Sequence, residues 1–200
     1  LSVHGPEASE KFVQEVVWRS YFKGWLERRP QVWASYRQGL EADLVALDRD
    51  RRLRRDVDRA MDGQTGLACL DLFAGSGVLG IEAASRGATH VTLVERDART
   101  FAVLRDAAAA LGTDRLELVR ADAVKFLARA TRRYDLLFLD PPYRQGWIER
   151  VAPMLTGVLA ADARIYVEAE HFIERVGSWE TVRSGRAGQV CYHLLEALQT

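Results

Sequence analysis

The chain has 200 residues, of which 48% are hydrophobic and 28% charged, and its 28 basic and 28 acidic residues give a formal net charge of zero. This balance excludes a disordered chain, and it excludes nucleic-acid binding through a bulk positive charge, so that any such contact needs a local basic patch. No apolar run approaches the roughly 20 residues that span a bilayer, and the short polar start does not resemble a signal peptide, so we expect a cytoplasmic protein without a membrane contact. The two cysteines, Cys69 and Cys191, have no metal or redox spacing and are expected to be reduced and buried.

Residues 1–66 are expected to form a helical segment of their own. Glu7 to Arg28 is predicted to be a helix that is apolar on nearly all sides, which is typical of a helix inside a larger helical domain. Residues 32–47 predict a second, amphipathic helix, and Arg51 to Met61 a third, highly charged one. Because the first helix needs a partner for its apolar surface, self-association through it stays open, and so does the oligomeric state.

Part of this segment resembles a known family. The stretch KFVQEVVWRSYFKGWLERRPQVWASYRQGLEADL is similar to a piece of the helical FAD-binding domain of DNA photolyases and cryptochromes, whose E-x-x-W-R element is present as Glu15, Trp18 and Arg19. In that family the Glu and the Trp line the pocket for the damaged base pair. The resemblance covers about residues 4–70 and lacks the rest of the flavin cradle, so flavin-dependent DNA repair is an alternative that the sequence does not favour.

From Leu67 to residue 200, strands and helices alternate, which predicts an α/β domain with a mostly parallel sheet covered on both faces. Strands are expected over residues 67–73, 90–95, 116–120, 134–140, 163–168, 179–184 and 189–197. Helices are expected over residues 78–86, 98–111, 123–130 and 147–159, the last of them interrupted at Pro153. The short connection between the last two strands predicts an antiparallel hairpin that closes a seven-stranded sheet.

A glycine-rich turn follows the first strand. Residues 75–80 match the pattern G-x-G-x-x-G between a strand and a helix, a geometry that presents free backbone N–H groups to a ligand. With Glu95 on the ribose hydroxyls, this pattern suits a dinucleotide, so an NAD-linked Rossmann enzyme is one alternative. Asp71 stands directly before the turn, where it can hold the amino end of an amino-acid-like ligand, and this favours a different cofactor.

The fourth strand leads into Asp140, Pro141, Pro142 and Tyr143. A carboxylate and an adjacent backbone carbonyl can both accept hydrogen bonds from an exocyclic amino group, which orients the lone pair of its nitrogen toward an electrophile. The prolines stiffen the loop and remove N–H donors, and the tyrosine ring offers a surface on which a flipped-out base can stack. The pattern therefore predicts a site for an amino group of a nucleobase.

These motifs together resemble one family of enzymes. DLFAGSGVLGIEAASRGA, VTLVERD, RADAVKFL and FLDPPYRQG are similar to S-adenosylmethionine-dependent methyltransferases, and most of all to those that methylate guanine N2 in bacterial small-subunit ribosomal RNA. The resemblance covers about residues 67–198 and implies a Rossmann-like fold with ribosomal RNA or the small ribosomal subunit as partner, and no metal. It implies a cofactor site formed by Asp71, Phe73, Ala74, Gly75, Ser76, Gly77, Glu95, Arg96, Asp122 and Ala123. It also implies that Asp140 and Pro141 hold the guanine amino group while Pro142 and Tyr143 complete the base site.

The chain departs from this family before the first strand. The N-terminal arm and the R-P-T-x-x-x-x-R-E segment of the family are absent, and the photolyase-like segment stands in their place. We therefore expect two fragments joined between Gly66 and Asp71, with residues 1–66 and 67–200 as separate domains. A chimera that binds S-adenosylmethionine without methylating RNA is the remaining alternative.

Overall fold

The computed structural model describes residue 52 and residues 54–198. The first two predicted helices and the photolyase-like residues Glu15, Trp18 and Arg19 lie outside the described residues. The described residues belong to the compact unit Arg52–Thr200, so this unit begins before the predicted boundary at residue 67. None of its described helices is long and apolar enough to cross a membrane.

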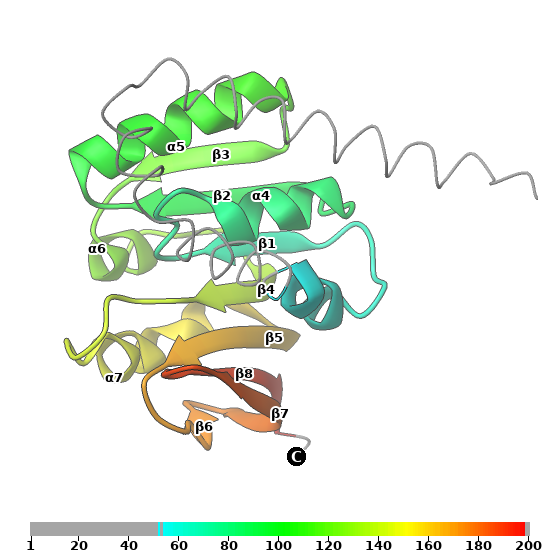
Figure 1. The fold of residues 1–200 in the computed structure, drawn as a ribbon, viewed down its shortest axis with the longest axis vertical. Helices are drawn as coiled ribbons and strands as arrows, with labels where there is room; N and C mark the ends of the chain where they lie inside the picture. Colours follow the sequence, from blue (N-terminus) through cyan, green and yellow to red (C-terminus); the bar gives the residue numbers. More distant parts are fainter. Residues whose placement is uncertain (1–51, 53, 199–200) are drawn as a thin grey trace, which may run out of the picture. The chain divides into compact units, whose positions relative to one another are not determined.

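One mixed sheet forms the centre of this unit (Figure 1). Its strands are β1 (Ala68–Asp71), β2 (His90–Glu95), β3 (Leu116–Arg120), β4 (Tyr134–Leu139), β5 (Leu159–Ala169), β6 (Arg175–Val176), β7 (Trp179–Ala187) and β8 (Val190–Ala197). They lie in the order β3-β2-β1-β4-β5-β8-β7-β6, and the first five are parallel. The predicted α/β fold is confirmed, although the sheet has eight strands rather than seven because the short β6 pairs with β7.

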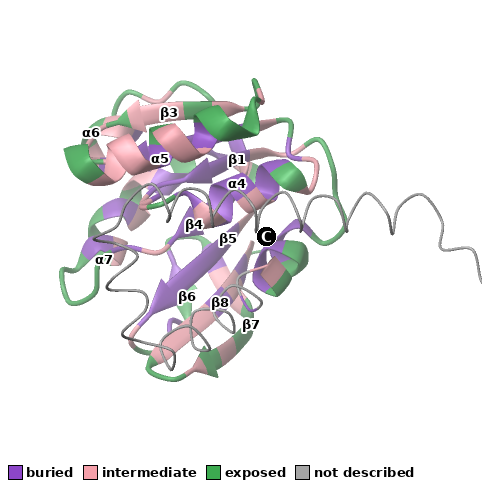
Figure 2. Ribbon diagram, turned by 45° about the horizontal axis from the view of Figure 1, so that its top comes forward, coloured by how far each residue is buried: buried purple, intermediate pink, exposed green. Residues whose placement is uncertain are grey.

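The predicted hairpin at the end of the chain is also present. β7 and β8 pair antiparallel, and β8 in turn pairs antiparallel with β5, so the hairpin extends the parallel part of the sheet. At the other end, β3 pairs with β2 alone and is the least buried strand of the parallel part, whereas β1 and β4 are buried along most of their length (Figure 2).

Helices cover both faces of the sheet, as near-continuous apolar strands require. They are α4 (Val78–Ser85), α5 (Ala98–Leu111), α6 (Ala123–Leu127), α7 (Trp147–Val151) and the 3-10 helix η1 (Ala152–Gly157). The predicted helix over residues 147–159 is divided, since Pro153 has no N–H to continue the α-helical pattern, and the chain tightens into η1. The sequence predicts that this helix ends at residue 159 and that the next strand begins at residue 163. In the structure, residues 159–162 belong to β5 instead.

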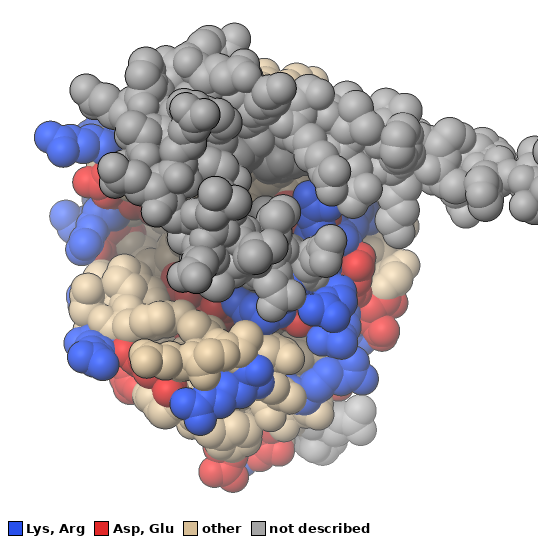
Figure 3. Space-filling view, viewed as in Figure 1, with Lys and Arg blue, Asp and Glu red and all other residues tan. Residues whose placement is uncertain are grey.

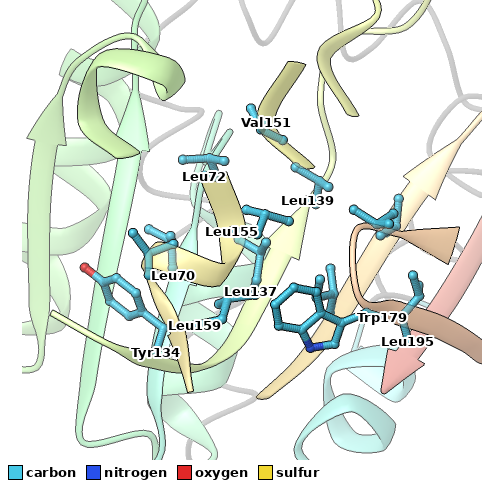
Figure 4. Close-up of a cluster of buried hydrophobic side chains, with 14 of the residues drawn as sticks. Leu70, Leu72, Tyr134, Leu137, Leu139, Val151, Leu155, Leu159, Trp179 and Leu195 are labelled. Atoms are coloured by element: carbon cyan, nitrogen blue, oxygen red, sulfur yellow. The ribbon is translucent and has the colours of Figure 1, made fainter. Parts of the chain in front are cut away.

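Strand periodicity decides which side chains face which helices. Successive side chains of a strand point to opposite faces, so Leu93 and Val94 of β2 contribute to different layers. On the Val94 face, Leu70 and Leu137 pack in one apolar cluster with Leu155 of η1 (Figure 4). This cluster joins β1 and β4, which pair in register and whose carboxyl ends carry the predicted site.

A helical segment over residues 52 and 54–61 belongs to the same unit. Arg52 lies 3.1 Å from Glu168 of β5, and the Tyr166 hydroxyl donates to Glu168 at 2.8 Å and lies 3.2 Å from Asp56. The side chains of Asp56 and Glu168 are 2% and 1% exposed, so their charges are almost completely removed from water. Buried charges of this kind are tolerated when they are paired. The pairing attaches this helix to the sheet, although the helix precedes the predicted domain boundary at residue 67.

We predict that Arg52→Met lowers the free energy of unfolding by about 3 kcal/mol or more, because it leaves Glu168 buried with its partner removed. Urea unfolding monitored by circular dichroism measures this change. The double variant Arg52→Met with Glu168→Gln should recover part of the loss, since it buries less unpaired charge. Equal stability of the wild type and the single variant would show that the helix is not held by this pair.

Candidate functional site

The predicted site residues meet at one edge of the sheet. β1 lies between β2 and β4 and runs parallel to both, so the carboxyl ends of these strands are neighbours. The chain leaves β1 toward β2 and later returns to β4 on the other side, which makes the gap between β1 and β4 a topological switch point, the usual ligand site of such sheets. Asp71 ends β1, Glu95 ends β2, and Asp140 follows β4 directly.

Asp71 is the most deeply buried charged group of this edge, with 2% exposure. One of its carboxylate oxygens accepts the Gly80 N–H at 3.1 Å, across the whole glycine turn. Burial raises the pKa of Asp71 to about 7; the negative charges of Asp140 and Glu95 add to the shift, and the Gly80 N–H opposes it. The predicted site residues Asp71, Glu95 and Asp140 therefore lie near enough to interact electrostatically.

The glycine turn has the backbone that its sequence predicts. Gly75 and Gly77 have φ values of 54° and 87°, a region that favours glycine. A Cβ on Gly77 would collide with Leu104, and one on Gly80 would lie 2.8 Å from a methyl group of Leu93. The three glycines therefore let α4 start directly after the turn and pack closely on β2.

Glu95 ties this turn to the second strand. Its Oε2 accepts the Gly75 N–H at 3.0 Å, and its Oε1 accepts the Asp97 N–H at 2.6 Å. Each carboxylate oxygen has a second lone pair, so Glu95 can still accept hydrogen bonds from a ligand. The Ala74 N–H donates to the Val94 carbonyl at 2.9 Å, which fixes the start of the turn against β2.

Asp122 has a structural task that the sequence reasoning missed. Its Oδ1 accepts the N–H groups of Val124 and Lys125 at 3.1 and 3.3 Å, so it caps the N-terminus of α6. Asp97 caps α5 in the same way. An aspartate directly before a helical run is a recognised capping signal, so the sequence contained this information. Ala123, the other predicted residue here, is buried at the first position of α6.

The loop after β4 carries the predicted base site. Pro141 is buried, whereas Pro142 and Tyr143 are exposed, with 41% of Tyr143 accessible. Arg144 adopts φ 60°, an uncommon backbone for a residue with a side chain, and Gly146 has φ 62° where α7 begins. The loop therefore presents Tyr143 to solvent from a backbone held in an uncommon conformation.

Trp147 links the loop after β4 to the predicted cofactor residues Phe73 and Arg96. The sequence alone does not predict it as a site residue. Its buried ring meets Phe73 edge to face at 5.4 Å, and the guanidinium groups of Arg96 and Arg150 lie over it at 5.7 and 4.0 Å. Phe73 and Arg96, both predicted cofactor residues, are thus held by the residue that follows the base-site loop. Ser76 is exposed at the tip of the glycine turn.

Comparison with known proteins identifies the family. A family model described as Conserved hypothetical protein 95 matches residues 58–196. Ribosomal RNA small subunit methyltransferase D of Escherichia coli is 40% identical over 133 residues, which cover 64% of this chain and 67% of the relative. The chain belongs to this methyltransferase family. The Haemophilus influenzae relative of the same name is 32% identical over 136 residues, 64% of this chain and 70% of its own length.

Solved structures give the same picture of the methyltransferase fold. The Escherichia coli protein yhhF superposes with a TM-score of 0.68 at 36% identity, covering 73% of this chain and 84% of that one. The ribosomal protein L11 methylase of Lactobacillus delbrueckii, at 21% identity and a TM-score of 0.65, shares the fold over 76% of this chain and 80% of its own. The family match begins at residue 58, and these comparisons do not support the expected photolyase resemblance of residues 4–70.

The raised pKa of Asp71 predicts a stability that depends on pH. Because the fold binds the proton of Asp71 more tightly than the unfolded chain does, this contribution is fully present below about pH 4 and is lost as the pH rises through 7. The shift from 3.8 to about 7 corresponds to roughly 4 kcal/mol. We expect Asp71→Asn to remove this loss, so that the variant gains stability over the wild type between pH 4 and 8 in urea unfolding.

Asp97→Asn is the matched control, because the N–H of Thr100 lowers the pKa of Asp97. A lowered pKa stabilises the fold above about pH 4 and this contribution is lost as the pH falls. The difference between wild type and Asp97→Asn should therefore stay nearly constant between pH 4 and 8 and change only as the pH falls below about 4. A difference between wild type and Asp71→Asn that stays constant from pH 4 to 8 would contradict the assigned pKa.

Proposed function

We infer that the protein transfers a methyl group from S-adenosylmethionine to an exocyclic amino group of ribosomal RNA, guanine N2 of the small subunit in particular. The observation that carries this inference is the meeting of Asp71, Glu95 and Asp140 at the switch point of a chain that belongs to the methyltransferase family. Since the substrate is ribosomal RNA or the small ribosomal subunit, we place this activity in the cytoplasm.

The residues at the switch point fit the methyl donor. In this proposal the Asp71 carboxylate binds the amino group of the methionine part, whose positive charge offsets the cost of ionising a buried acid. The residues of the glycine turn, Phe73, Ala74, Gly75, Ser76 and Gly77, surround the rest of that part. Glu95 accepts hydrogen bonds from the ribose hydroxyls, and Arg96, Asp122 and Ala123 border the adenine.

The proposed chemistry at the loop after β4 needs no covalent enzyme intermediate. S-adenosylmethionine supplies an electrophilic methyl group. The Asp140 carboxylate and the Pro141 carbonyl accept the two N–H groups of the target amino nitrogen, which directs its lone pair toward the methyl group. Pro142 stiffens the loop, and Tyr143, being exposed, stacks on the extruded base. Positioning is the main source of rate in this scheme.

Two features favour the methyl donor over NAD, for which the glycine turn alone would also serve. A dinucleotide brings a pyrophosphate to the turn, and the three carboxylates that interact there would repel that group. The methionine part brings an amino group and a sulfonium, which those charges attract. The comparisons do not support flavin-dependent repair, and the photolyase-like residues Glu15, Trp18 and Arg19 lie outside the described residues.

We predict that Asp140→Ala abolishes methyl transfer, with a loss of at least 100-fold, while S-adenosylmethionine binds with a nearly unchanged dissociation constant. Asp71→Ala should instead weaken cofactor binding. The measurements are transfer of a labelled methyl group to naked small-subunit ribosomal RNA and to small ribosomal subunits, mass spectrometry of the modified nucleoside, and calorimetric titration of the cofactor.

Asp97→Ala serves as the control, since Asp97 is an exposed helix cap near the same edge. Full activity of Asp140→Ala would refute the role of that carboxylate. Tight NAD binding without S-adenosylmethionine binding would refute the function. Cofactor binding without transfer to either RNA substrate would favour the chimera that keeps the cofactor site alone.

A further inference from the structure

An open hollow of about 1150 Å³ lies between the edge strand β3 and α6. Its walls include Glu117, Val119 and Asp122 from the β3 side, Phe126 of α6, and Tyr134 at the start of β4. Because Asp122 follows the carboxyl end of β3 and Tyr134 begins β4, the hollow extends from the site edge of the sheet toward the opposite edge. We propose that this hollow, here called the β3 groove, binds the sugar-phosphate backbone of the RNA; this rests on the proposed function.

The β3 groove has more basic than acidic residues in its walls. Over the coloured part of the face drawn in Figure 3, basic and acidic side chains are interspersed, in keeping with the zero net charge of the chain. The β3 groove differs, since five basic residues line it and two acidic ones. The five basic residues are Arg96, Arg120, Lys125, Arg129 and Arg132. This is the local basic patch that a chain without net positive charge needs to bind RNA.

The basic side chains of the groove are available to bind phosphate groups. All five basic residues of the groove are exposed, and within residues 52 and 54–198 none of them forms an ion pair with an acid. The two acids of the groove are already engaged: Glu117 lies 3.0 Å from His90 and accepts the Thr92 hydroxyl at 2.9 Å, and Asp122 caps α6. Four of the five cations are arginines, whose planar guanidinium groups match phosphate geometry.

The β3 groove is connected to the proposed base site through Arg96. Arg96 lines the groove and also lies over the ring of Trp147, the residue that begins α7 directly after the base-site loop. A basic path therefore leads from the end of the loop that carries Tyr143 into the groove. The five residues of β3 extend over roughly 16 Å, a length along which a nucleic-acid strand carries several phosphates. RNA that follows this path is gripped beside the base that enters the site.

The test uses the full chain and removes two cations far from the cofactor edge, in the double variant Arg129→Gln/Arg132→Gln. A charge-matched control is Arg105→Gln/Arg183→Gln, which removes exposed arginines of α5 and β7. The probes are S-adenosylmethionine in calorimetric titrations, naked small-subunit ribosomal RNA in filter binding between 50 and 200 mM salt, and intact small ribosomal subunits in methyl-transfer kinetics.

We expect the groove variant to bind naked RNA about tenfold more weakly than wild type and to lose about one unit of salt slope for each phosphate contact removed. Its KM for RNA should rise by a similar factor, while kcat and cofactor affinity stay unchanged. The control variant should match the wild type. A merely structural role of the two arginines would instead reduce cofactor binding and kcat together.

Three outcomes decide between the two proposals. If no RNA is methylated but the groove variant still loses RNA affinity and salt slope, the proposed function fails and the groove stands. If methylation is normal and the groove and control variants behave alike, the groove is overturned while the function stands. If the groove variant has a raised KM for intact subunits but keeps the wild-type affinity for naked RNA, the groove contacts ribosomal protein and the proposal is overturned.

Discussion

The parallel pairing of β1 with β4 is the constraint on which the rest of the site depends. Because Asp71 lies in register with Phe138, the two strands end side by side, and the carboxylates of Asp71 and Asp140 at these ends interact. The topology makes this position a switch point, since the chain continues from β1 to one side and reaches β4 from the other. A glycine turn and a proline loop far apart in sequence thereby become the two halves of one proposed site.

This site contains a buried acid whose ionised form is disfavoured by its surroundings. Asp71 is held by the Gly80 N–H, but burial and two neighbouring carboxylates outweigh that bond and raise its pKa to about 7. A cationic ligand favours the ionised form of Asp71. In our proposal, the positively charged amino group of the cofactor has this effect. The ionised Asp71 carboxylate therefore lowers the stability of the fold, which fits a role in binding a cation. Perturbed pKa values tend to lie at functional sites.

Sequence patterns predicted the parallel strands and their order along the chain well, because each is a buried apolar run between turn residues. They predicted less well where tertiary contacts decide. The strand β6 has two residues and little pattern of its own, and β5 begins earlier than expected because Leu159 already pairs with Tyr134 of β4. The helical segment over residues 52 and 54–61 carries alternating charges that suggest a solvated face, yet Arg52 and Asp56 of this segment are buried against β5.

The residues proposed for the chemistry could be recognised in the sequence alone. The glycine turn, Asp71, Glu95, Asp140 and Tyr143 all stand in short motifs, because their proposed roles depend on residue type and local spacing. Tertiary structure alone decided how they combine. It placed Trp147 between Phe73 and Arg96, and it gathered basic residues from β3, α6 and the following loop along one groove. Such arrangements join residues distant in the chain, and only the packing of strands and helices fixes the distances between them.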